Sequence, residues 1–430
     1  MPNTASVKIW NKEVGIIAWD NSSGLGSFEF TPSFLDTNWD ISPLQMPLSE
    51  PKGGIFSFSE LRDIGAFKGL PGLLADVLPD RYGNALIDAW LTRNGRASGS
   101  MNPVETLLFI GKRGMGALEF APPDPIGLNT VTKLEIADLI EVSNHILSGR
   151  KKFLVNLSAH EQKALLAILK IGTSAGGARP KALIAFNKKT MEVRSGQAEA
   201  PKGFTHWIIK FDGVKDTQFG KTTGYGRVEM AYHLMAKDAG IEMTECRLLE
   251  ENNRAHFMTR RFDRQHSKDK LHVQSFCAMR HFDFNDRYSY SYEHLFETLR
   301  LLNLPYPQHE QVYRRMVFNV LSRNCDDHTK NFSFIMDKNG TWKLSPAFDV
   351  CHSYRPESEW VSRQLLSVNG KRDNIDRNDF LSVAHQMSIK KASNIIDHIN
   401  DIIQNWLHYA RQVNVNSKIA SAIQKTLIKI

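Results

Sequence analysis

The sequence predicts an α+β protein of more than one unit, with a β-rich first part and a mainly helical last part. Three observations support this fold class. The chain has 430 residues, which is more than one compact core usually holds. Short apolar runs broken by Gly, Pro and Asn fill residues 1–122. Beyond Tyr290, apolar residues recur mainly at helical spacing.

The composition is that of an ordinary globular chain, at 42% hydrophobic and 23% charged residues. This balance excludes a disordered, collagen-like or membrane-embedded protein. The formal net charge of +8 is compatible with a phosphate-bearing ligand or a nucleic acid nearby. Four cysteines without a CxxC pair, and no leader-like apolar segment at the start, favour a reducing compartment. We therefore expect a cytoplasmic protein with no membrane partner.

The first part, residues 1–122, should open with a strand pair. Apolar alternation at 7–10 and 14–19 is interrupted at Asn11 and Lys12, as in a hairpin. Residues 70–78 and 85–91 carry helix-spaced apolar side chains. The proline cluster at 121–125 predicts the boundary of this subdomain.

The middle part, residues 123–264, should combine helices with a sheet. The pattern is helical from about 130 to 170, and strands are expected at 182–186 and 207–211. An amphipathic helix should cover 227–239, and another strand 255–262. The last part, residues 265–430, should be mainly helical, with one hairpin near Asn339-Gly340.

A glycine-rich segment precedes the predicted sheet: Gly172-Thr-Ser-Ala-Gly-Gly-Ala-Arg-Pro-Lys181. Small residues let backbone N–H groups approach phosphate oxygens, although they also form ordinary turns. The segment is neither a Walker A loop nor a kinase loop with spaced glycines. Phosphate binding by this loop is therefore one interpretation, and a plain turn is the other.

The segment Asn324-Cys-Asp-Asp-His-Thr-Lys-Asn331 is a stronger signal. Catalytic loops of protein kinases place an Asn five residues after the Asp that accepts the substrate proton, and Asp326 and Asn331 have this spacing. The predicted hairpin then returns the chain to Asp349. Carboxylate and amide oxygens suit Mg²⁺, so Asn331 and Asp349 are candidate metal ligands.

Lys210 ends a predicted strand that is otherwise apolar, where an ammonium group needs an anionic partner. Glu229, near the start of the amphipathic helix, is the candidate partner. Kinases hold nucleotide phosphates with such a strand lysine and helix glutamate. A lysine that reaches solvent at a strand end is the simpler alternative.

His328 next to Asp326 and Asp327 also permits a metal-dependent phosphohydrolase, since imidazole and carboxylates bind transition metals. No second histidine cluster matches it in the sequence. A structural role for His328 therefore stays open beside metal ligation.

Taken together, these segments resemble the HipA family of bacterial toxin serine/threonine kinases. The resemblance rests on the glycine-rich segment, on the Asn324–Asn331 segment, and on three further stretches: His206-Trp-Ile-Ile-Lys-Phe211, Arg261-Phe-Asp-Arg264 and Leu344-Ser-Pro-Ala-Phe-Asp349. It spans most of the chain. It implies a bilobal protein-kinase-like fold with a β-rich N-terminal subdomain and a mainly helical C-terminal lobe.

The resemblance also implies residue roles. Asp326 would be the catalytic base, Asn331 and Asp349 would bind Mg²⁺, and Arg260 to Phe262 would form the adenine hinge. Ser174 would be the autophosphorylated serine whose modification ejects the loop and switches the kinase off. The full set of expected ATP-binding residues is Ser174, Ala175, Gly176, Gly177, Ala178, Lys181, Lys210, Glu229, Arg260, Phe262, His328 and Lys330.

Family resemblance further implies partners. A small HipB-like helix-turn-helix antitoxin would neutralise the kinase and carry it to operator DNA. The substrate would be a protein serine, with an aminoacyl-tRNA synthetase such as the glutamyl enzyme as the known kind of target, so that translation and growth are inhibited. A non-catalytic corepressor that retains the kinase fold is the alternative from a different functional class.

Overall fold

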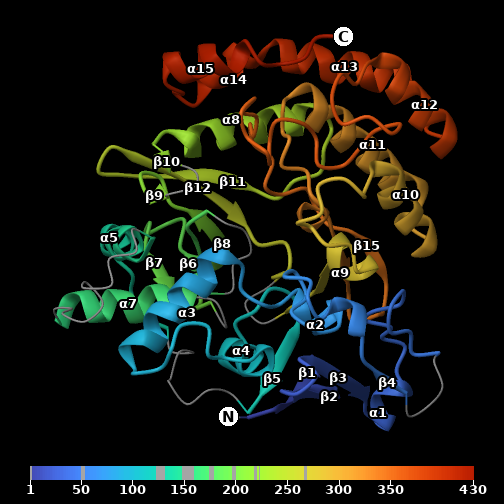
Figure 1. The fold of residues 1–430 in the computed structure, drawn as a ribbon. Helices are drawn as coiled ribbons and strands as arrows, with labels where there is room; N and C mark the ends of the chain where they lie inside the picture. The colour runs from blue at the N-terminus through green and yellow to red at the C-terminus, as the bar shows by residue number, and fades with distance from the viewer. Residues whose placement is uncertain are drawn as a thin grey trace.

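The computed structural model describes residues 2–49, 54–122, 131–147, 159–173, 179–195, 200–216, 220–221, 223–265 and 269–430. Figure 1 shows three layers of structure, with the N-terminal strands at one end, a central sheet, and the C-terminal helices at the other end. The observed α+β architecture, with a β-rich start and a helical end, is the predicted one.

An antiparallel sheet opens the chain. Its strand order is β4-β3-β2-β1-β5. The predicted strand pair is present, because β1 (Thr4–Ile9) pairs with β2 (Lys12–Asp20). Trp10 and Asn11 make the turn with positive φ angles of 48° and 67°, as expected for a two-residue hairpin loop. The remaining strands are β3 (Leu25–Phe30), β4 (Ile55–Phe56) and β5 (Leu118–Ala121).

Helical segments connect these strands. The predicted helix at 70–78 is short: α2 spans only Gly72–Ala75. The predicted helix at 85–91 is longer than expected, since α3 spans Arg81–Arg93. Asn102 and Glu105 form a reciprocal capping box at the start of α4 (Pro103–Ile110). The shorter pieces are α1 (Pro32–Leu35) and the 3₁₀ turn η1 (Ser59–Leu61).

The central sheet has the order β11-β12-β8-β6-β7. Helices α5 (Ile136–Leu147) and α7 (Ala159–Gly172) pack beside it, and α3 from the first part packs against both of them. Leu86 and Trp207 therefore belong to one apolar core. The strands are β6 (Lys181–Phe186), β7 (Val193–Ser195), β8 (Thr205–Lys210), β11 (Cys246–Glu251) and β12 (Arg254–Arg260), with a small pair β9 (Lys215–Asp216) and β10 (Gly220–Lys221) beyond them.

Helix α8 (Tyr225–Asp238) joins this sheet to the last part of the chain. It contacts β11 and β12 on one side and α13 and α14 on the other, as Figure 1 shows. The last part contains a small sheet, β13-β14-β15, and a series of helices. Their bounds are β13 (His272–Ser275), α9 (Phe276–Arg280), α10 (Tyr292–Leu301), α11 (Tyr306–Leu321), η2 (Thr329–Asn331), β14 (Ser333–Met336), β15 (Trp342–Leu344), α12 (Arg377–Met387), α13 (Ala392–Gln404), α14 (Trp406–Gln412) and α15 (Ser417–Gln424).

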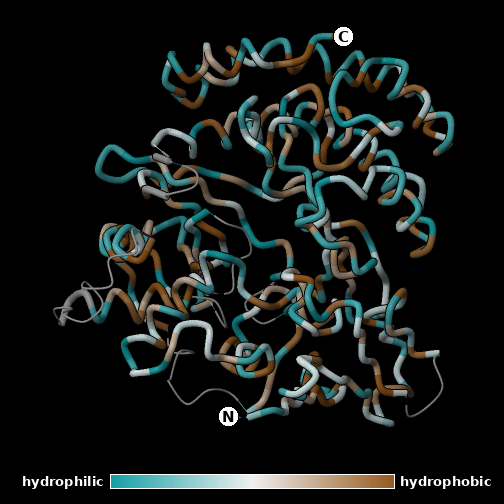
Figure 2. Tube along the Cα trace, in the orientation of Figure 1, coloured by the Kyte–Doolittle hydropathy of each residue, from teal (hydrophilic) through white to brown (hydrophobic). Residues whose placement is uncertain are grey.

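Burial follows the sequence pattern. In Figure 2 apolar and polar residues alternate along the C-terminal helices, and the buried isoleucines of α13, among them Ile396 and Ile399, face the core. All four cysteines are buried as free thiols. In the part of the chain that the structure describes, no helix has the length and apolarity needed to cross a membrane.

Candidate active site

Lys210 lies at the centre of the candidate site, at the end of β8. The expected ion pair with Glu229 of α8 is present, and Lys210 Nζ also donates to Asp349 Oδ1 at 2.5 Å. Burial alone would lower the pKa of Lys210, but the charges of Asp349 and Glu229 outweigh it and raise the pKa above its ordinary value. The side chain is therefore a fixed cation between two carboxylates.

Asp349 follows the β14–β15 hairpin, in the position that the sequence predicts. Its backbone φ is +55°, a left-handed conformation that costs energy in a residue other than glycine. Its second oxygen, Oδ2, lies 3.7 Å from Lys181 Nζ. Burial would raise the pKa of Asp349, but Lys210 and Lys181 hold it well below its usual range. The carboxylate is thus ionised and strained beside two ammonium groups.

Two more cations complete this charge cluster. Lys181 begins β6, opposite Lys210 in the β6–β8 register, and burial lowers its pKa. Arg179 packs its guanidinium 5.1 Å from the ring centre of Tyr225 and lies in the field of Glu229 and Asp349. Arg179 was missing from the expected ligands, although it stands in the glycine-rich segment that the sequence singles out.

Three cations therefore face two carboxylates at this point of the sheet. Such a surplus of buried positive charge suits a ligand that carries several negative charges. The donor set fits a polyphosphate ester with its metal ion, since the cations can meet phosphate oxygens and Asp349 offers carboxylate oxygen to a hard cation.

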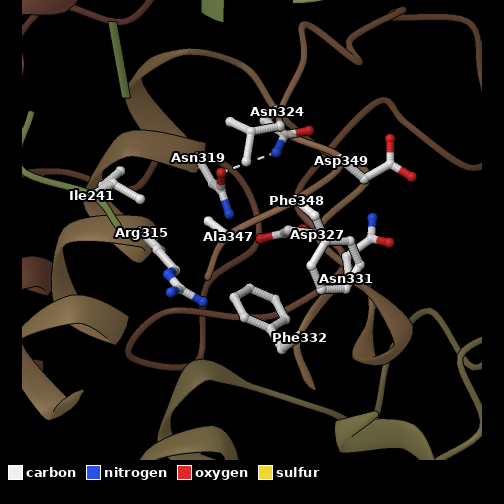
Figure 3. Close-up of a pocket in the computed structure, with 11 residues that line it drawn as sticks. Ile241, Arg315, Asn319, Asn324, Asp327, Asn331, Phe332, Ala347, Phe348 and Asp349 are labelled. Carbon is white, nitrogen blue, oxygen red and sulfur yellow. Dashed lines mark hydrogen bonds between the residues drawn. The ribbon is translucent and has the colours of Figure 1, made fainter. Parts of the chain in front are cut away.

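The predicted catalytic loop lies beside this cluster. Asn331 Nδ2 donates to the backbone carbonyl of Asp326 at 2.6 Å. Because the amide nitrogen is used in this way, the amide oxygen is the atom that Asn331 can offer to a cation. Asn331 and Asp349 line the same pocket and project on one side of it in Figure 3. The two expected metal ligands are thus brought together.

Asp326 and Asp327 have opposite environments. The Asp326 side chain is 37% exposed and accepts a hydrogen bond from Trp360. Asp327 is buried, and its oxygens accept hydrogen bonds from Tyr292 Oη, Gln364 Nε2 and the backbone N–H groups of Leu365 and Leu366. These donors use the oxygens that a metal ion would need, which removes a required ligand from the phosphohydrolase hypothesis.

The other two residues of this loop that were expected to bind ATP have protein partners. His328 lies against Phe284, with its Nε2 3.9 Å from Asp326 Oδ1. Lys330 forms an ion pair with Asp80 at 2.7 Å, and both side chains are largely buried. Asp80 is the N-cap residue of α3 and lies 250 positions from Lys330 in the sequence. No local pattern could have indicated this contact.

The expected hinge residues lie at the end of β12. Arg260 is the last residue of the strand and pairs with Trp207 of β8. The ring of Phe262 lies 5.7 Å from that of Phe348, the residue before Asp349. Their role in binding adenine stays a prediction.

Ser174, Ala175, Gly176, Gly177 and Ala178 lie outside the residues that the structure describes. The residue before them, Thr173, is buried and packs against α3. A Cβ atom at Gly83 of α3 would lie 2.9 Å from the Thr173 carbonyl oxygen. The position of Thr173 is therefore fixed by α3 in the first part of the chain.

Comparisons with known proteins agree with this architecture. The chain matches the HipA N-terminal domain over residues 5–121 and the HipA-like C-terminal domain over residues 173–406. A Haemophilus influenzae protein with the name "Putative kinase" is 28% identical over 155 residues, which are 33% of this chain and 44% of that protein.

Among solved structures, HipA of Shewanella oneidensis MR-1, from a toxin–antitoxin complex with HipB and operator DNA, matches with a TM-score of 0.68. The match covers 98% of this chain and 94% of that one, at 16% identity. The Helicobacter pylori proinflammatory kinase CtkA matches 58% of this chain and 92% of its own, at 16% identity and a TM-score of only 0.32. The match to the Shewanella protein shows that the fold is that of HipA, and because both HipA domain models match along the chain, this protein belongs to the HipA family.

Proposed function

We propose that this chain is an ATP- and Mg²⁺-dependent serine/threonine protein kinase of the toxin type. The observation that carries the proposal is the convergence of Lys210, Glu229 and Asp349 at one point of the central sheet. Asn331 lines the same pocket as Asp349, and Asp326 precedes Asn331 by five residues. Phosphoryl transfer requires these three kinds of group: cations that bind phosphate, a pair of metal ligands and a base.

Each residue has a task that follows from its contacts. Lys210, Lys181 and Arg179 bind phosphate oxygens, and Glu229 fixes the direction of the Lys210 ammonium group. Asn331 and Asp349 would hold the metal ion through oxygen atoms. Asp326, the more exposed carboxylate, orients the substrate hydroxyl and accepts its proton. When bound, ATP would supply the phosphoryl group and Mg²⁺ would neutralise charge on the phosphate oxygens.

The test is transfer of labelled γ-phosphate by the purified protein to itself or to an aminoacyl-tRNA synthetase. The parent should transfer label, and Asp326→Ala should not. Transfer by Asp326→Ala at the parental rate would contradict the assignment of the base. Absence of transfer by the parent, together with intact operator repression by Asp326→Ala, would favour the non-catalytic corepressor.

The proposal extends to partners and location. We infer a helix-turn-helix antitoxin that neutralises the kinase and bridges it to operator DNA, as HipB and DNA accompany the Shewanella relative in its complex. Phosphorylation of a synthetase in the cytoplasm would inhibit translation. A short helix-turn-helix reading frame next to this gene would support the proposal, and co-purification of its product with this chain is the direct test.

Self-regulation through Ser174 is part of the same proposal. A phosphate of about −2 charge on this loop would compete with ATP for the same cations and amide groups, so its addition should expel ATP. We expect mass spectrometry to find phosphate on Ser174 in the parent and none in Asp326→Ala. The phosphorylated form should show no ATP binding by titration, and normal binding would rule the switch out.

A further inference from the structure

The Asp326 carboxylate has a partner that no sequence motif indicated. Trp360 donates its indole N–H to Asp326 Oδ1 at 2.6 Å, which is short for a hydrogen bond from nitrogen to oxygen. No bond to Oδ2 is found among the residues that the structure describes. One carboxylate oxygen is therefore held by the protein, and the other is left for a substrate hydroxyl.

Trp360 is held firmly enough to act in this way. Its loop returns to the catalytic loop through Gln364, whose side chain donates to the Asn324 carbonyl at 3.2 Å and to Asp327 at 3.0 Å. On its other side, the backbone N–H of Trp360 donates to Ser358 Oγ at 3.2 Å. Arg287 donates to the neighbouring carbonyl of Glu359 at 2.6 Å. The indole thus comes from a segment fixed on both sides.

Other contacts do not fix the Asp326 carboxylate. Asn331 bonds the backbone carbonyl of Asp326 and leaves its side-chain torsion free. His328 Nε2 lies 3.9 Å from Oδ1, beyond hydrogen-bond distance. The ring of His328 instead lies 6.2 Å from that of Trp360, so it packs beside the donor. Among the described residues, the indole is the group that sets the direction of the base.

We propose that Trp360 is a positioning residue for the reaction, which holds the Asp326 carboxylate so that Oδ2 faces the attacking hydroxyl. This proposal rests on the kinase function proposed above. Trp360 would act through orientation, because a carboxylate that rotates freely spends less time in line with the hydroxyl. Misplacement of a reacting group by about 1 Å can lower the rate about 100-fold. Trp360 itself touches neither substrate nor nucleotide in this role.

The test compares three variants. Trp360→Phe keeps an aromatic ring but removes the donor, and its kcat should fall on the order of 10- to 100-fold, with KM for ATP within about twofold. Trp360→His restores a ring N–H and should recover part of the loss. Trp342→Phe is the matched control, because it removes a half-buried indole that donates to the backbone carbonyl of Asp40 instead. It should keep parental turnover.

A second measurement does not depend on kinase activity. In ¹⁵N-indole spectra of the eight tryptophans, the signal lost in Trp360→Phe should shift in Asp326→Ala, while the Trp342 signal should not. A parent without kinase activity would contradict the proposed function, and the indole spectra would still decide whether Trp360 holds Asp326. An active parent whose kcat is unchanged in Trp360→Phe, or an unshifted Trp360 signal in Asp326→Ala, would overturn the positioning role.

Discussion

Asp326 and Asp327 are neighbours in sequence, yet their side chains point into different surroundings. Asp326 is partly exposed and has one side-chain donor, Trp360. Asp327 is enclosed by donors from two other segments, Tyr292 of α10 and residues 364–366. One carboxylate is therefore available to a ligand, while the other holds the loop through its buried hydrogen bonds.

We expect the two amide variants to separate these roles. Asp326→Asn should lower kcat by about 100- to 10,000-fold and leave the melting temperature within a few degrees of the parent. Asp327→Asn turns an NH₂ group toward buried donors, which should lower the free energy of unfolding by about 1–3 kcal/mol. Labelled-ATP kinetics and urea denaturation measure the two effects. Equal loss of stability in both variants would contradict the assignment of a chemical role to Asp326 and a structural role to Asp327.

At the scale of elements, α3 is the link between the first part of the chain and the catalytic loop. Its N-cap residue, Asp80, forms an ion pair with Lys330. Gly83, one turn later, packs against Thr173, the residue before the undescribed part of the glycine-rich segment. Burial would lower the pKa of Lys330, but Asp80 and Asp76 outweigh it and raise the pKa. The N-terminal end of α3 therefore contacts both the predicted catalytic loop, at Lys330, and Thr173 in the glycine-rich segment.

Asp80→Asn should destabilise the protein by about 3 kcal/mol, because it leaves the Lys330 ammonium group poorly compensated in a buried place. The matched control is Asp269→Asn, which breaks the exposed pair with Lys338 and should cost less than about 1 kcal/mol. Urea denaturation gives both values. In the double variant Asp80→Asn with Lys330→Met, the loss should be smaller than the sum of the two single losses. Additive losses would show that the pair is not coupled.

The sequence predicted the elements whose pattern is local. The strand pair around Asn11, the helix at 227–239 and the hairpin at Asn339-Gly340 are all present, since alternation, helical spacing and turn residues act over a few positions. Lys210 and Glu229 were paired correctly because strand and helix are adjacent in the chain. Asp80 and Trp360 could not be predicted, because each meets the catalytic loop only through tertiary packing. The helix at 70–78 is shorter than predicted: α2 ends at Ala75, and the side chain of Asp76 at its C-cap accepts a hydrogen bond from the Ser275 N–H.

At the scale of the whole molecule, a buried charge cluster joins the first part of the chain to the segment that follows β12. Asp263 lies between Arg261 and Arg264 at 2.7 and 2.6 Å. The same carboxylate accepts from the Gly116 N–H at 2.8 Å, and the guanidinium groups donate to the carbonyls of Gly114 and Gly116. All three charged side chains are buried. The loop before β5 and the segment after β12 are therefore held together by one buried cluster of charges.

This buried charge cluster should make the free energy of unfolding fall in acid. Burial would raise the pKa of Asp263, but Arg261 and Arg264 hold it well below its usual range. Its stabilising contribution is therefore complete above about pH 4, the ordinary value, and is lost progressively as the pH falls further. Asp263→Asn should cost about 3–5 kcal/mol at pH 7 and flatten the loss of stability below pH 4. Urea titrations at pH 3, 4 and 7 check this, and equal acid slopes in parent and variant would refute it.

The burial of every thiol has a practical consequence for measuring distances within the molecule by dye labelling. Burial raises the pKa of Cys246, Cys277 and Cys351 to about 12, so these groups stay protonated and poorly reactive toward maleimides. The native cysteines should therefore take up little dye when a new cysteine on the surface is labelled. Cysteines placed at Met191 beside the central sheet and at Leu301 on the C-terminal lobe, both about half exposed, would accept a donor and an acceptor dye. A change in energy transfer on addition of ATP would report a change in the distance between the central sheet and the C-terminal lobe, without removal of a native cysteine.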